Sequence, residues 1–138
     1  AGVEPDPRLL AEAQSSEADG HAAALRLLDG GAPFDAVFAA SDRIAIGVIA
    51  ALRDRGWSVP GDVSVVGFDD IAAAAHFNPP LTTVQQDTQR AGEMLVDNLL
   101  RLIDGEQVES ALIEPRLVVR ASCGGAPGAV SALPDRRP

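Results

Sequence analysis

Acidic and hydroxyl side chains stand where two strand-like runs of the sequence end. Ser41 and Asp42 directly follow one short apolar run, and Asp69 and Asp70 follow a second. In an open α/β sheet, ligands bind in the crevice beyond the carboxyl ends of the strands. Carboxylates and hydroxyls at such an edge suit a polyol, a phosphate-accepting aspartate or a metal ion. The stretch 41–87 therefore predicts a polar site.

Several of these residues also have a purely structural interpretation. Asp42 is placed to cap the helix that follows it, because a carboxylate can accept hydrogen bonds from the free amides of a first helical turn. Ser41 is then the better candidate for a ligand contact. Asp70 either caps the next helix or faces the site, whereas Asp69 stands one residue too early for a cap. Gln86 carries an amide that suits sugar hydroxyls, but a solvent-facing position at a helix start explains it equally well.

The chain lacks residues that several enzyme classes require. Phospho-receiver domains and haloacid-dehalogenase-type phosphatases pair their aspartates with a lysine, and this chain has none. No G-x-S-x-G elbow, P-loop or G-x-G-x-x-G fingerprint is present. Cys123 is the lone cysteine, and His21 and His76 lie too far apart for a local metal motif. The sequence therefore predicts no enzyme, no metal and no cofactor. A Mg²⁺-dependent phosphatase or phospho-receiver that uses Asp69 and Asp70 is kept as a lower-ranked alternative.

Composition and charge narrow the remaining classes of protein. The chain has 138 residues and a formal net charge of −9, and all of its basic residues are arginine. This balance predicts that the chain alone repels DNA, since DNA-binding proteins neutralise phosphates with clustered basic residues. No run is long enough to span a bilayer, and no signal peptide is visible, so we expect a cytoplasmic protein that does not enter the membrane. The absence of an initiator methionine predicts an excised or processed piece.

Local patterns predict an α/β fold with a parallel sheet and helices on both faces, because strand-like and helix-like segments alternate. One helix, 43–55, carries two apolar stripes, and the stripe that includes Ile46 and Ile49 points away from the core stripe. In so small a chain the second stripe is a candidate contact with another chain. Expected strands are 8–13, 36–40, 63–68, 81–86 and 111–122; expected helices are 16–28, 43–55, a short one after 70, and 88–104, whose Ala91, Leu95, Leu99 and Leu102 form a predicted core stripe.

Three motifs in fixed order carry a resemblance to a known family. They read FDAVFAASDRIAIGVIAALRDRGWSVPGDVSVVGFDD, then FNPPLTTVQQD, then LIEPRLVVRAS. Together they resemble the effector-binding core of the lac-repressor (LacI/GalR) family of transcription regulators. The resemblance implies a periplasmic-binding-protein-like (type I) fold of two subdomains around a cleft.

The resemblance also implies a division of the chain. Residues 1–123 correspond to an effector-binding and dimerisation domain, with the C-terminal subdomain at about 1–80 and 115–123 and a crossover segment at about 81–114. The helix at 88–104 would then pack in the other subdomain, which precedes Ala1 together with the DNA-binding headpiece. Residues 124–138 are expected to be a disordered tail.

Site roles follow from the same resemblance. Asp69 corresponds to a ligand-binding aspartate, Ser41 to a polar ligand contact and Gln86 to a crossover residue that faces the cleft. Ser15 stands where many members carry an aromatic ring that stacks on the ligand, so this chain departs from a stacked pyranose or purine. The cleft arginine of the family lies upstream of Ala1.

A dimer interface is implied as well. Ile46 and Phe77 fall at positions where the family dimerises, and Ile49 shares the stripe of Ile46. The leading interpretation is therefore the ligand-sensing and dimerisation domain of a LacI-type repressor. It would bind a small effector, expected to be a sugar, form a homodimer, and reach DNA only through a headpiece outside this chain. The alternative is a sugar-binding protein of a transport system.

Overall fold

A five-stranded mixed sheet forms the centre of the molecule. The computed structural model describes residues 4–125 and 130–132. The strands are β1 (Ala36–Phe38), β2 (Ser64–Asp69), β3 (Thr82–Gln85), β4 (Arg116–Val118) and β5 (Val130–Ala132), and they lie in chain order across the sheet. The first three strands are parallel, as predicted, whereas β4 and β5 pair antiparallel. Strand β4 runs antiparallel to β3 because the chain leaves the sheet along β3 and returns directly beside it.

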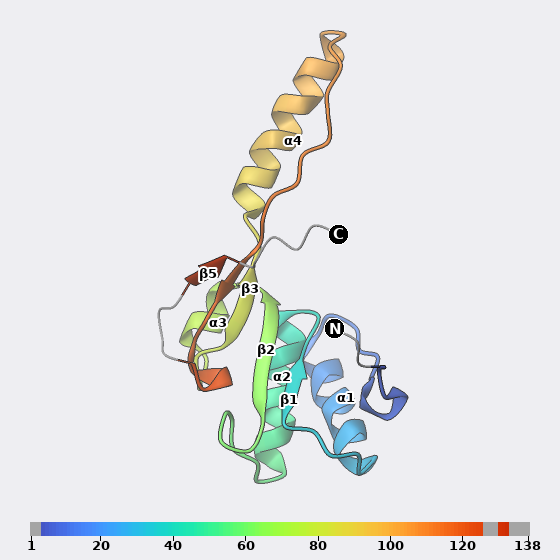
Figure 1. The fold of residues 1–138 in the computed structure, drawn as a ribbon, viewed down its shortest axis with the longest axis vertical. Helices are drawn as coiled ribbons and strands as arrows, with labels where there is room; N and C mark the ends of the chain where they lie inside the picture. The colour runs from blue at the N-terminus through green and yellow to red at the C-terminus, as the bar shows by residue number, and fades with distance from the viewer. Residues whose placement is uncertain (1–3, 126–129, 133–138) are drawn as a thin grey trace.

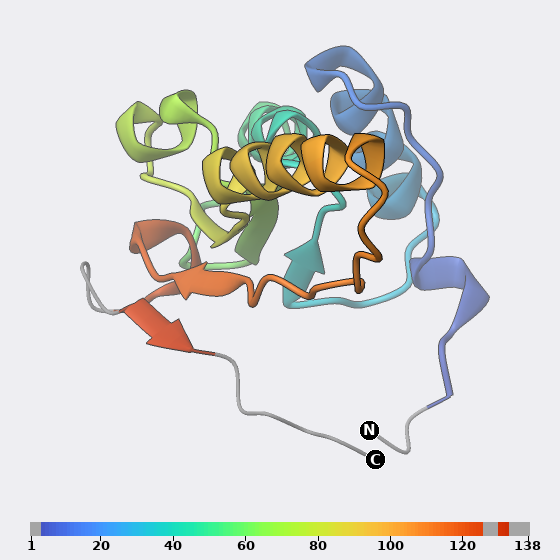
Figure 2. The same ribbon diagram turned by 90° about the horizontal axis from the view of Figure 1, so that it is seen from above.

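Three helices cover one face of the sheet (Figure 2). They are α1 (Glu17–Asp29), α2 (Asp42–Asp54) and α3 (Ala72–His76). Helix α1 begins as the sequence predicts, at Ser16, whose hydroxyl accepts a hydrogen bond from an amide in the first turn. Helix α2 begins in the same way, but at Ser41 rather than at the expected cap Asp42. Within the described residues the helical cover is one-sided, and Phe38 on β1 is 66% exposed. Helices on the second face, which the sequence predicted, are not seen in this part of the chain.

Helices α1 and α2 approach each other through two glycines. A β-carbon at Gly47 would lie 2.0 Å from the backbone oxygen of Glu17, and one at Gly20 would lie 2.4 Å from that of Ile44. The backbones therefore touch where neither helix carries a side chain. This contact encloses α2, most of whose residues are buried. The core cluster comprises Ala24, Ala39, Ala45, Val48, Ile49, Ala51, Leu52, Val63, Val65, Ala74 and Leu81.

Helix α4 (Thr88–Ile103) projects away from the sheet and is followed by an extended return segment (Figure 1). None of its residues is buried: Leu95 is 70% exposed and Leu99 and Leu102 are each 56% exposed, so the described residues leave the predicted core stripe uncovered. The amphipathic pattern is real, but the described residues provide nothing to cover it. No helix among the described residues is long and apolar enough to cross a membrane.

Two further expectations are wrong in detail. Residues 8–13 form no strand. Instead, Pro7–Leu9 make a short 3-10 helix that Asp6 caps, because the Asp6 carboxylate accepts a hydrogen bond from the Arg8 amide at 2.9 Å. At the other end, Val130–Ala132 form β5, so the expected disordered tail is wrong for these three residues. Residues 126–129 and 133–138 lie outside the described part.

Candidate functional site

Ser41 occupies the start of α2 at the carboxyl edge of the sheet. Its hydroxyl oxygen accepts a hydrogen bond from the Ile44 amide at 3.3 Å and lies 3.2 Å from the hydroxyl of Ser15. Ser41 is therefore the helix cap, and the prediction that Asp42 plays this part is wrong. The backbone of Ser41 is still extended and Asp42 is the first helical residue, so the helix begins one residue earlier than the cap interpretation of Asp42 requires. Ser41 is 6% exposed, whereas Ser15 is exposed.

The Asp42 side chain is instead buried and forms hydrogen bonds that connect three segments of the chain. Its carboxylate accepts hydrogen bonds from the Thr83 hydroxyl at 2.5 Å and from the Ile71 amide at 2.9 Å. Burial raises the pKa of Asp42, and these two hydrogen bonds oppose the rise. Gly67 makes room for the carboxylate, since a β-carbon there would lie 2.2 Å from its Oδ1 atom. Asp42 thus ties the start of α2 to β3 and to the segment after β2.

The end of β2 has an unusual backbone. Asp69 and Asp70 have φ angles of 114° and 56°, values that residues with a β-carbon rarely adopt. Asp70 does not cap α3, where the cap position is Ile71 and carries no side-chain bond. Its Oδ1 atom accepts a hydrogen bond from Arg120 at 2.7 Å, and its Oδ2 atom accepts one from Gln85 at 2.9 Å. Asp70 is therefore a structural anchor at this edge.

Asp69 keeps a half-buried carboxylate at the same turn. It accepts a hydrogen bond from the side-chain amide of Gln86 at 2.9 Å. The four residues expected to contact an effector thus form two bonded pairs, Ser15 with Ser41 and Asp69 with Gln86. These pairs lie at the carboxyl ends of the neighbouring parallel strands β1 and β2, where the sequence predicts a site.

The residues expected at a dimer interface are placed differently. Ile49 is 1% exposed and belongs to the core cluster, and Ile46 is 7% exposed. Neither side chain offers area to a second chain, because α2 is enclosed within its own fold, and we correct the sequence expectation for these two residues. Phe77 is half-buried at the end of α3 and packs against the core cluster.

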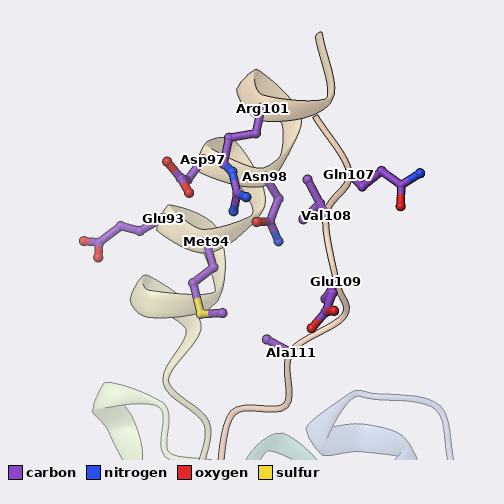
Figure 3. Close-up of a pocket in the computed structure, with 9 residues that line it drawn as sticks. All are labelled: Glu93, Met94, Asp97, Asn98, Arg101, Gln107, Val108, Glu109 and Ala111. Atoms are coloured by element: carbon purple, nitrogen blue, oxygen red, sulfur yellow. The ribbon is translucent and has the colours of Figure 1, made fainter. Parts of the chain in front are cut away.

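Two cavities lie beside the crossover segments. Gln86 lines a polar cavity of about 600 Å³ together with Gln85, Arg90 and Arg116. A second cavity of about 720 Å³ lies between α4 and the return segment (Figure 3) and contains none of the four expected contact residues. No cluster of three or more histidine, cysteine or acidic side chains that could hold a metal occurs in the described part of the chain.

Long-range contacts were not visible in the sequence. Asp70 and Arg120 are 50 residues apart, and Asp42 and Thr83 are 41 apart, so no local pattern links them. The signal that could have helped is the glycine at position 67, which stands in a strand of otherwise bulky residues. A glycine inside a strand often marks a close approach.

The fold and its polar edge define a periplasmic-binding-protein-like domain. The family model described as "Periplasmic binding protein-like domain" matches residues 1–123. The chain is 40% identical over 124 residues to the HTH-type transcriptional regulator CelR of Thermobifida fusca, covering 88% of this chain and 36% of that protein.

Solved structures agree with this class. A transcriptional regulator CelR–cellobiose complex superposes with a TM-score of 0.82 at 40% identity, covering 88% of this chain and 38% of that one. A lac repressor dimer bound to operator and the anti-inducer ONPF superposes with a TM-score of 0.78 at 34% identity, covering 81% and 34%. The chain belongs to the LacI/GalR family of transcriptional regulators. It spans little more than a third of the length of the relatives compared here, which are named as regulators and not as enzymes.

Proposed function

We propose that this chain is the non-catalytic ligand-sensing and dimerisation domain of a LacI-type transcriptional repressor. It binds a small carbohydrate at the carboxyl edge of β1 and β2 through Asp69, Gln86, Ser41 and Ser15. The observation that carries this proposal is the Asp69–Gln86 pair at a strand end, at 2.9 Å. The reported cellobiose complex of a relative supports a sugar as the ligand class. A transport protein is the less supported alternative, because the curated relatives compared here are transcriptional regulators.

The chemistry of the edge favours a neutral ligand rich in hydroxyls. Each sugar hydroxyl can donate to a carboxylate and accept from an amide, which is the combination that Asp69 and Gln86 present. Ser15 and Ser41 add two further hydroxyls that both donate and accept. Asp42 lies close to Asp69 and has only neutral hydrogen-bond donors, whereas Arg120 offsets the charge of Asp70, so an anionic ligand would meet the like charges of Asp42 and Asp69.

Binding would regulate DNA recognition through the rest of the protein. An effector shifts a dimer between two states only when it binds one of them more tightly. The effector edge would supply this difference in affinity. DNA contact would come from a headpiece outside these residues, as expected for a chain with a net charge of −9.

The test is ligand binding by the full-length protein. A panel of neutral mono- and disaccharides that includes cellobiose is screened by thermal shift, and the hits are measured by calorimetry. We expect at least one saccharide to raise the melting temperature, and Asp69→Asn to weaken its binding at least tenfold. Asp54→Asn is the matched control, because Asp54 also accepts one hydrogen bond from a side-chain nitrogen, that of His21 at 2.8 Å, but belongs to the other end of α2. Binding by Asp69→Asn at wild-type strength, or no stabilising saccharide, contradicts the proposal.

Dimerisation is tested at the end of α3. The exposed Ala75 lies on α3, so a charge there disturbs a contact surface at little cost to the fold. Phe77, at the C-cap of α3, also packs against the core cluster, so its variant must first be shown to fold. We expect Ala75→Glu and Phe77→Glu to sediment as monomers and the wild type as a dimer. Circular dichroism checks that both variants remain folded. Folded variants that both stay dimeric would exclude this surface as the interface.

A further inference from the structure

The turn at the end of β2 is held in a conformation that its residues do not favour. Asp69 and Asp70 both have positive φ angles, 114° and 56°. Such values in residues with a β-carbon persist only where the surroundings fix them, and they gather at functional sites. Glycine, which adopts positive φ freely, is absent from both positions. The side chains of the turn are therefore expected to have a role that glycine could not fill.

The surroundings that fix this turn are largely buried. The Asp70 side chain is 11% exposed and that of Arg120 is 18% exposed, with 2.7 Å between Arg120 Nη2 and Asp70 Oδ1. The other guanidinium nitrogen, Nη1, donates to the backbone oxygen of Leu81 at 2.8 Å. The backbone amide of Asp70 faces the Thr83 hydroxyl at 3.4 Å. Arg120 therefore links the β2 turn to the start of β3.

The two partners of Asp70 come from different segments of the chain. Gln85 ends β3, which leads out to α4, whereas Arg120 lies after β4, at the end of that strand away from α4. Figure 1 shows β3 leading up to the projecting helix, with the return segment leading back down to the sheet. The Asp70 carboxylate thus bonds one donor from the end of β3 and one from the segment after β4, and Asp69 beside it bonds Gln86, which follows β3.

We propose that Asp70, Arg120 and Gln85 act as a clasp of positioning residues. The clasp fixes the β2 turn so that Asp69 faces the effector, and it couples that turn to the end of β3 and to the segment after β4; this role rests on the proposed effector binding. If Asp70 relaxed to negative φ, its carboxylate would turn away from these donors and the orientation of Asp69 would change with it. Ligand contact and inter-segment contact would therefore change together.

The experiment compares variants of the full-length protein by amide hydrogen exchange and by calorimetry with cellobiose. Arg120→Gln removes the ion pair, and Gln85→Ala removes the outgoing link at an exposed side chain that the fold does not need. The control is Arg55→Gln, which breaks an exposed arginine–aspartate pair with Asp29 at 2.8 Å, away from the turn.

We expect Arg120→Gln to speed exchange of the Asp70 and Ile71 amides at least tenfold and to weaken cellobiose binding at least tenfold. Gln85→Ala should change both in the same direction by less, and the control should change neither. A purely structural role would lower the melting temperature without changing the affinity of the folded protein. Unchanged exchange, or faster exchange with unchanged affinity, overturns the clasp.

The two proposals fail separately. If the wild type does not bind cellobiose, affinity is measured with the saccharide of the panel that raises the melting temperature most. If no saccharide binds, the proposed function fails, and the exchange measurement decides only whether Asp70, Arg120 and Gln85 fix the β2 turn. Faster exchange at residues 70 and 71 in Arg120→Gln and Gln85→Ala supports that part, and exchange equal to that of the control overturns it. Should Arg120→Gln not fold, Gln85→Ala decides in the same way.

Discussion

Replacement of Gly47 by alanine should separate α1 from α2 and disturb the serine pair at the candidate site. The new β-carbon would stand 2.0 Å from the Glu17 oxygen and 2.7 Å from the His21 nitrogen. Both are backbone atoms, which cannot rotate away as a side chain could. Relief to 3.0 Å requires the helices to part by 3.0 − 2.0 = about 1 Å, and a gap of this size forfeits about a quarter to a half of each dispersion contact.

The energetic cost follows from two opposing effects. Overpacking of a buried site typically costs about 1–3 kcal/mol. Alanine returns about 1 kcal/mol because it favours the helix more than glycine does. Since the obstructing atoms belong to the backbone, we expect the overpacking cost to be near or above the upper end of that range, about 3 kcal/mol. After the helix gain of about 1 kcal/mol, the net loss of stability is about 2 kcal/mol. With a slope of about 2 kcal/mol per molar urea, the unfolding midpoint should fall by about 1 M.

Urea unfolding followed by circular dichroism measures this loss. The control is Gly92→Ala on α4, where a β-carbon meets no other atom within 4 Å, and this variant should lose no stability. The displaced end of α1 also carries Ser15, so saccharide binding by the folded Gly47→Ala variant should weaken. A Gly47→Ala midpoint equal to that of the wild type would refute the argued contact between the helix backbones.

Three further changes test the buried network and the exposed helix. Burial raises the pKa of Asp42 in the folded state, so the contribution of this residue to stability falls as the pH rises above the ordinary aspartate pKa. Urea unfolding from pH 4 to 7 should therefore show the stability of the wild type falling relative to that of Asp42→Asn. A relative stability that rises with pH contradicts the burial effect. Thr83→Val removes a donor to the Asp42 carboxylate and should cost about 1–3 kcal/mol in the same assay at pH 7, while Thr83→Ser should recover most of it. Leu99→Gln, at a 56% exposed position, should change unfolding free energy by under about 0.5 kcal/mol, whereas Leu52→Ala, at 0% exposure, should cost about 2–5 kcal/mol.

Local signals in the sequence were sufficient for most elements. The sequence predicts a helix at 16–28, and the observed α1 has the expected start, because the Ser16 hydroxyl caps it, and ends at Asp29, just before two glycines of which Gly31 has a positive φ angle of 69°. The strand β2 was predicted at 63–68 from a mostly β-branched and apolar run, and the structure places it at Ser64–Asp69. These features depend on neighbours within one helical turn or one strand, so the sequence contains the information directly.

The features that could not be predicted from the sequence depend on contacts between residues far apart in the chain. Ser41 and Asp42 are both good caps, and the choice between them depended on Thr83, whose hydroxyl holds the Asp42 carboxylate from 41 residues away. Residues 8–13 are apolar enough for a strand, but no described strand lies beside them to complete the hydrogen bonds. The α4 pattern likewise identifies an apolar face but contains no information on what covers it.

The balance of charge at the strand ends explains why Asp69 is the strongest candidate for a ligand contact. Three carboxylates share this edge, and two of them each accept two hydrogen bonds from within the fold. Asp42 is buried with two dipolar donors, and Asp70 has an arginine and an amide. Asp69 has a single neutral amide partner and remains half-exposed. A carboxylate with unused acceptor capacity at such an edge favours a ligand that brings hydroxyl donors, and the neighbouring Asp42, which has no cationic partner, disfavours one that brings negative charge.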